Sequence, residues 1–270
     1  MRGLATGLCA GCVVGLLRLS HDRAAARVAL WLEEWREVWW TVPIWFGVLV
    51  ALAVILRRIV REEPLISGSG IPQTELALAG RLSFTWWRVL LAKFLGSWLA
   101  LFGGLALGRE GPSIQMGGAV GAGFHALWRP AAPHALTGSP YVVAGAVAGL
   151  AAAFGAPAAG VLFAFEEMKS RRDTSLIVAA CASAIGAHLM IRIVFGMGRI
   201  LPFAGFEAPP LSSFWIVALE GAVFGVLGVG YNKTLLWLHD REAGQTLIPD
   251  RWRALPPLLL AGCLALFAPL

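Results

Sequence analysis

Long apolar segments alternate with short polar ones along most of the chain. Their length and composition predict membrane helices, although several are shorter than the ~20 residues that a helix needs to span a bilayer. We therefore expect an all-α fold in which some helices are tilted or broken and stop partway. The predicted helices cover residues 4–19, 41–58, 87–107, 113–128, 141–153, 157–169, 174–195, 213–238 and 254–270.

Two local patterns indicate how these helices are arranged. Within residues 22–40, tryptophan recurs every four positions among charged side chains, which is typical of an amphipathic helix or a helix extension at the membrane interface. Glycine and alanine are dense around Gly117 and Gly121 and through residues 144–160. Small residues let helices approach closely in lipid, so we expect close packing there and assign these residues no chemistry.

The composition is that of a membrane protein. The 270 residues are 58% hydrophobic and 14% charged, and the mean hydropathy is +0.72. We therefore expect a polytopic protein with one transmembrane domain over residues 1–270. The net charge is +6, but the cations gather at the ends of apolar segments and form no basic face with interleaved aromatics. This pattern excludes nucleic acid as a partner.

Basic clusters predict the orientation of the chain. One lies at residues 57–61 and the other at residues 169–172. By the positive-inside rule, both should be cytoplasmic. The apolar run at residues 4–19 follows a single basic residue, so we expect it to be the first membrane helix rather than a cleaved signal sequence.

The cysteines indicate no metal or redox site. Cys9 and Cys12 form a C-x-x-C pair, but no second pair and no nearby histidine accompany it. Cys181 and Cys263 are isolated in apolar stretches. We expect all four to pack as small residues and expect no metal site.

The first motif is Gly68-Ser69-Gly70-Ile71-Pro72, which precedes a helix-compatible segment. Proline suits the first helical turn, and a helix N-terminus presents free N–H groups and a partial positive charge. Such a turn can hold an anion, with the serine hydroxyl as a further donor. The alternative is an ordinary capped turn.

The second motif is Gly108-Arg109-Glu110-Gly111-Pro112, which lies among apolar residues. A charged side chain at membrane depth costs about 2.5–3.5 kcal/mol on insertion scales, so this pair marks a transport path or a proton relay. The carboxylate of Glu110 can itself occupy an anion site and can leave it when protonated. The alternative is an Arg109–Glu110 ion pair at a helix end.

The third segment is a broken helix that resumes at Pro157 and ends in Glu166 and Glu167. These acids could simply neutralise the cations at residues 169–172 at the interface. The segment alone does not decide between that interpretation and a functional one.

Together, the three segments resemble the CLC family of chloride channels and chloride/proton exchangers, and the match also includes residues 86–90 and Lys93-Phe94. The resemblance implies an inverted-repeat fold with the ion at the repeat interface. The chain would supply the first repeat and the start of the second, with the C-terminal repeat largely missing. The family's Gly-x-Phe-x-Pro motif and pore tyrosine are absent, so we expect a fragment or a truncated product.

The resemblance also implies roles for individual residues. Ser69 is similar to the serine that coordinates the central chloride in chloride-preferring members, with Gly68, Gly70 and Ile71 around it. Glu110 resembles the gating glutamate. The residues that support this site would be Gly108, Arg109, Gly111, Pro112 and Glu166.

The remaining implied roles concern protons. Glu167 is similar to the internal proton-transfer glutamate of exchangers, and Glu75 and Lys93 match a buried pair near the inner proton route. Gln73 departs from the family, where an acid commonly follows the first motif. We do not expect that change to abolish transport.

The sequence thus predicts coupled chloride/proton exchange by a transporter that is not an enzyme and needs no cofactor. Its partners would be chloride, protons, the lipid bilayer and, at full length, a second copy in a homodimer, in the plasma membrane of a prokaryote. One alternative is a passive chloride channel. A remote alternative is an intramembrane serine hydrolase that uses Ser69 and His188.

Overall fold

The computed structural model describes residues 1–36, 38, 40–103, 108–166, 173–198 and 210–244. Within these ranges the regular structure is entirely helical, which confirms the predicted all-α class. The chain divides into two compact units, one formed by Met1–Ile200 with Ala254–Leu270 and the other by Leu201–Arg253. The single domain expected over residues 1–270 stays a prediction, and the expected helix at 254–270 lies outside the described residues.

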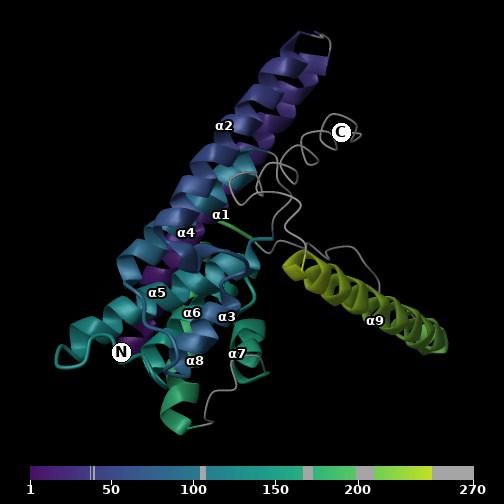
Figure 1. Cartoon of the computed structure of the whole chain (residues 1–270). Coiled ribbons are helices and arrows are strands. Elements are labelled where there is room, and N and C mark those ends of the chain that lie inside the picture. Colours follow the sequence, from purple (N-terminus) through teal and green to yellow (C-terminus); the bar gives the residue numbers. More distant parts are fainter. Residues whose placement is uncertain (37, 39, 104–107, 167–172, 199–209, 245–270) are drawn as a thin grey trace. The chain divides into compact units, whose positions relative to one another are not determined.

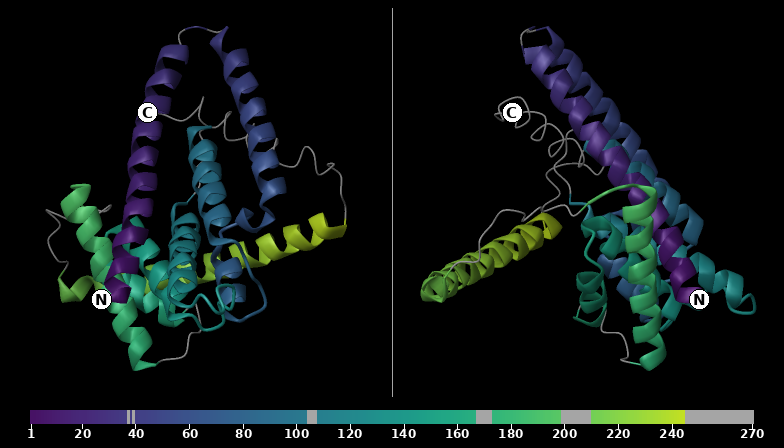
Figure 2. Two further views of the ribbon diagram at one scale, coloured as in Figure 1. Left: turned by 90° about the vertical axis from the view of Figure 1, so that its left-hand side faces the viewer. Right: turned by 180° about the vertical axis from the view of Figure 1, so that it is seen from behind.

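The first unit begins with two long helices, α1 (Arg2–Arg36) and α2 (Thr41–Glu62). In α1, the predicted membrane helix at 4–19 and the amphipathic segment that follows, as far as Arg36, form one continuous helix. No glycine or proline interrupts the chain between Leu16 and Thr41, so nothing ends the helix where its composition changes. Helix α4 (Trp86–Phe102) contacts both α1 and α2, and it lies between them in Figure 2.

Shorter helices complete the first unit (Figure 1). A single helical turn, η1, links α2 to the helix that follows the first motif, and a π-helical turn, η2, extends α8. The bounds are η1 Pro64–Ile66, α3 Ile71–Leu78, α5 Glu110–Trp128, α6 Pro140–Phe154, α7 Pro157–Glu166, α8 Thr174–Leu189 and η2 Met190–Val194.

Glycines bring α5 and α6 into backbone contact, which confirms the close packing expected from the small residues. A Cβ atom at Gly117 would meet the carbonyl oxygen of Gly145, and one at Gly149 would meet that of Ser113. Most of both helices is buried. Larger side chains would separate the two helices, so the start of α5 is held on a rigid base.

Helix α8 packs on α1 and α6 by the same means. A Cβ atom at Gly3 would lie 2.8 Å from the carbonyl oxygen of Ala179. The buried Ser183 hydroxyl donates to the Ala144 carbonyl oxygen at 2.8 Å, which ties α8 to α6. The first unit therefore has a core in which α5, α6 and α8 are fixed against one another.

Four of the described helices are long and apolar enough to cross a membrane. Three belong to the first unit, at Arg2–Ala24, Pro43–Glu62 and Thr174–Val194. The fourth, Phe214–Trp237, lies in α9 (Phe214–Gly244) of the second unit, after the turn η3 (Leu211–Ser213). Every side chain of that span is exposed.

Candidate functional site

The first motif forms a tight turn between η1 and α3. Gly68 and Gly70 have φ angles of 72° and 93°, in the left-handed region that only glycine adopts at low cost. The Ile71 N–H donates to Ser69 Oγ at 3.3 Å, and Pro72 occupies the first turn of α3. Because Oγ accepts this bond, the hydroxyl hydrogen of the exposed Ser69 stays available to an acceptor such as an anion.

The side chain of Lys93, on α4, holds this turn in place. The residue is 4% exposed, and its Nζ donates to the carbonyl oxygens of Ile66 at 2.8 Å and of Gly68 at 2.7 Å. The ammonium group thus orients the turn and places a positive charge next to it. The pairing of Lys93 with the half-buried Glu75 of α3, implied by the family resemblance, stays a prediction.

The second motif meets the first at the start of α5. A Cβ atom at Gly111 would lie 2.9 Å from the Cα atom of Ser69, and it would also meet the Ser69 carbonyl oxygen. A Cβ atom at Gly70 would lie 2.6 Å from the Cβ atom of Gln115. Two segments that are distant in the sequence are therefore in backbone contact, and glycine is required on both sides.

Gln115 is a site residue that the sequence reasoning missed. It is 3% exposed, and its Nε2 donates to the Leu65 carbonyl oxygen at 2.7 Å, so it ties α5 to the turn that precedes Ser69. Its Oε1 atom and the Ser113 hydroxyl are buried and have no hydrogen-bond partner among the described residues. The one available signal was a polar side chain on a helix that is otherwise almost wholly apolar or small.

Glu110 is the first residue of α5, and its carboxylate is exposed. Its Oε2 atom lies so close to Gly108 that it would clash with a Cβ atom at that position. A bulkier residue at 108 would displace the carboxylate. Pro112 follows in the first turn, so its missing N–H removes no helical bond.

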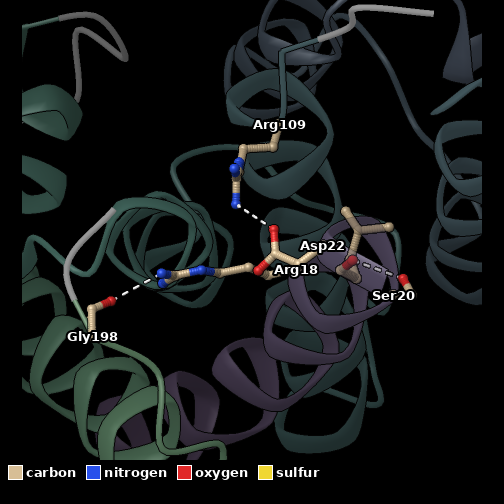
Figure 3. Close-up of polar contacts among 6 residues, drawn as sticks. Arg18, Ser20, Asp22, Arg109 and Gly198 are labelled. Atoms are coloured by element: carbon tan, nitrogen blue, oxygen red, sulfur yellow. Dashed lines mark hydrogen bonds and ion pairs between the residues drawn. The ribbon is translucent and has the colours of Figure 1, made fainter. Parts of the chain in front are cut away.

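Arg109 points toward α1 (Figure 3). Its Nη1 atom lies 3.7 Å from Asp22 Oδ1, and both side chains are partly exposed. Among the described residues the ion pair of Arg109 is therefore made with Asp22, and the alternative of an Arg109–Glu110 pair at the helix end is not found. Asp22 was not singled out in the sequence, because the contact joins distant segments.

The structure describes only part of the third segment, the broken helix that in the sequence ends in Glu166 and Glu167. Gly155, with a φ angle of 67°, ends α6, and α7 begins at Pro157, which confirms the broken helix. Glu166 ends α7 and is exposed. Glu167 and the cations after it lie outside the described residues.

The arrangement gives no support to a Ser69–His188 hydrolase. His188 belongs to α8, which packs on α1, α6 and α7. Ser69 instead lies at the turn held by Lys93 and Gln115, from α4 and α5. The Ser69 oxygen accepts a backbone N–H, as in a capped turn.

The comparisons with known proteins all indicate the same family. A sequence profile described as voltage gated chloride channel matches residues 46–270. The H(+)/Cl(-) exchange transporter ClcA of Vibrio cholerae is 37% identical over 241 residues, which is 86% of this chain and 51% of the relative. That of Vibrio campbellii is 38% identical over 238 residues, or 85% of this chain and 50% of the relative. The chain thus spans about half the length of these curated relatives, which are transporters and not enzymes.

Solved structures agree on the fold. A slow cyanobacterial Cl-/H+ antiporter superposes with a TM-score of 0.81 at 29% identity, over 100% of this chain and 64% of that one. A eukaryotic CLC transporter superposes with a TM-score of 0.69 at 22% identity, over 98% of this chain and 48% of that one, which shows the fold alone.

Proposed function

The chain belongs to the voltage gated chloride channel family, the CLC family, and we propose that it takes part in the exchange of chloride for protons across a membrane. The observation that carries the proposal is the backbone contact between Ser69 and Gly111, which brings the hydroxyl of Ser69 close to the helix end that bears Glu110. The relatives described above are exchangers by name, which supports exchange over passive conduction.

Two helix N-termini would supply the anion site. Helices α3 and α5 begin at Ile71 and Glu110, and each presents the N–H groups of its first turn and the positive end of its dipole. The Ser69 hydroxyl adds a donor, and Lys93 adds a positive charge beneath the turn. This set stabilises a small anion without a metal or an organic cofactor.

Glu110 would couple the two ions. When ionised, its carboxylate competes with chloride for the donors at the start of α5. When protonated, it no longer does so, and it can carry its proton away as chloride enters. Competition of one carboxylate with one anion makes the movements of chloride and protons mutually dependent.

Protons would reach Glu110 from the cytoplasm by a separate route. We assign the inner end of this route to Glu167, with Glu166 beside it, and the inner end of the chloride route to Ser69. The assignment of Glu167 rests on the family resemblance. The transporter would work as a homodimer in a prokaryotic plasma membrane.

The test is chloride-driven proton movement in liposomes. Vesicles loaded with chloride are diluted into low chloride at equal pH, with the membrane potential clamped by potassium and valinomycin. An exchanger takes up protons as chloride leaves, so the external pH rises. Chloride efflux with no pH change would instead identify a passive channel.

Because the chain spans about half the length of its relatives, two samples are assayed. One is the chain by itself, and the other is the chain co-expressed with the C-terminal half of the Vibrio cholerae exchanger. Below, "the transporter" means whichever of the two carries chloride. Absence of chloride flux from both would contradict the proposal.

A further inference from the structure

Two arginines, Arg18 and Arg109, lie where α1 passes the start of α5 (Figure 3). Arg18 and His21 lie on α1 and are each 7% exposed. Arg109 precedes Glu110 and reaches toward the same face of α1, where it pairs with Asp22. Electrostatic interactions link Arg18 and His21 to both Asp22 and Arg109, so these four side chains form one cluster. We call it the α1–α5 basic cluster.

Several polar atoms of the cluster have no partner within the part of the chain that the structure describes. Arg18 Nη2 donates to the Gly198 carbonyl oxygen at 2.9 Å, but Arg18 Nε and Nη1 and His21 Nε2 are buried and make no hydrogen bond to any described residue. Buried polar groups in folded proteins are nearly always satisfied, and a buried guanidinium is especially costly to leave unpaired. The unpaired donors therefore point to a ligand that accepts hydrogen bonds.

The charges of the cluster identify the kind of ligand. Asp22 pairs with the Arg109 guanidinium, and its side chain is 55% exposed, so water solvates part of its charge. The Arg18 guanidinium extends away from Asp22, to the Gly198 carbonyl (Figure 3). The cluster is left with an excess of positive charge. The ligand should therefore be an anion that balances a single charge.

The burial of Arg18 limits the size of that anion. A phospholipid headgroup is bulky and stays at the membrane surface, whereas the free donors of Arg18 belong to a side chain that is 7% exposed. A small monovalent anion can reach such donors once it sheds part of its hydration shell. Chloride fits this description.

We propose that the α1–α5 basic cluster is a second chloride site, formed by Arg18, His21 and Arg109, from which anions pass to the site at Ser69 and Glu110. This inference rests on the proposed function, since it takes chloride as the transported ion. The cluster draws its donors from α1 side chains, whereas the Ser69 site draws them from the helix ends of α3 and α5. The two sites can therefore be tested apart.

The direct test is anomalous scattering from bromide in crystals of the transporter. We expect one peak beside Arg18 and Arg109 and a separate peak at Ser69. A peak at Ser69 alone overturns the second site and leaves the proposed function standing. A peak at the cluster alone supports the second site and contradicts the anion site at Ser69, and no peak at either position overturns both.

A transport measurement tests the role of the cluster in anion entry. Arg18→Gln should raise the chloride concentration for half-maximal flux by about tenfold, the lower end of the effects that charged entrances have on association rates, without changing the maximal flux. Arg129→Gln removes an exposed arginine just after the other end of α5 and is the matched control, with no expected change. A concentration dependence unchanged in Arg18→Gln overturns the proposal.

Because Arg18 also holds the Gly198 carbonyl, Arg18→Gln could act by loosening the fold. Asp22→Asn distinguishes the two causes, since it removes the carboxylate that competes with the anion and leaves Arg18 intact. The proposal requires this variant to bind bromide more strongly at the cluster and to reach half-maximal flux at lower chloride. Weaker binding in Asp22→Asn would overturn the proposal, because it would show that the acid helps to form the site rather than compete for it.

Discussion

Gly111 lies so close to Ser69 that a Cβ atom at position 111 would come within 2.9 Å of the Ser69 Cα atom. The contact joins the residue after the proposed gating glutamate to the residue proposed to hold chloride. Any movement of the α5 N-terminus therefore moves the Ser69 turn as well. This contact gives a structural reason for both motifs to contribute to the one proposed anion site.

Gly111→Ala should separate the two motifs. The added methyl group meets backbone atoms, which cannot rotate away, so we expect destabilisation of about 1–3 kcal/mol together with weaker chloride binding. Thermal unfolding in detergent and chloride titration calorimetry measure the two effects. Gly47→Ala is the control, since a Cβ atom there meets nothing within 4 Å. Equal chloride affinity in wild type and Gly111→Ala would show that the contact does not shape the site.

Lys93→Met should release the turn at residues 66–68. The variant keeps most of the side-chain volume but leaves two carbonyl oxygens without their donor, at a cost of about 1–3 kcal/mol for each that stays buried. We expect lower thermal stability and weaker chloride binding. Arg88→Gln, at an exposed position of the same helix, should change neither quantity. If Lys93→Met binds chloride as the wild type does, the charge beneath the turn has no part in anion binding.

Ser69→Pro should change anion selectivity. It deletes the hydroxyl and one N–H group, which penalises strongly hydrated chloride more than weakly hydrated nitrate. The ratio of nitrate to chloride flux should rise. Ser69→Ala, which deletes the hydroxyl alone, should give a smaller rise. An unchanged ratio in both variants would leave Ser69 as a capping residue.

Glu167→Gln should stop proton movement while chloride movement continues. The amide cannot carry a proton, and the residue is assigned to the proton route alone. Chloride and proton fluxes are recorded from the same liposomes, with Glu62→Gln as a control at an exposed acid. A parallel loss of both fluxes in a folded protein would make Glu167 a structural partner of the nearby cations.

Features that depend on neighbouring residues could be predicted from the sequence. Positive φ angles at Gly70 and Gly155, and helix starts near Pro72 and Pro157, follow from glycine and proline chemistry. The continuous helix α1 was harder to predict, because its composition changes where its backbone does not. The family resemblance, carried by three motifs in order, was confirmed by the comparisons.

Features that depend on contacts between distant segments could not be predicted. The ion pair of Arg109 with Asp22 and the bond from Gln115 to Leu65 join parts of the chain whose approach is set by helix packing. The bonds from Lys93 to the carbonyls of the Ser69 turn also join distant segments, and the pairing of Lys93 with Glu75 implied by the resemblance stays a prediction. The sequence shows polar residues on apolar helices, which mark them as candidates for such contacts. Their partners can be identified only from the folded structure.

The measurement that tests the central claim most directly is proton uptake driven by a chloride gradient in liposomes that contain the Glu110→Gln transporter. The substitution keeps the shape of the side chain and removes its titratable charge. We predict that chloride efflux persists, loses its pH dependence and no longer drives protons, while the wild type raises the external pH. Proton uptake undiminished in Glu110→Gln would contradict the account, because the carboxylate at the start of α5 could then not be the group that exchanges with chloride.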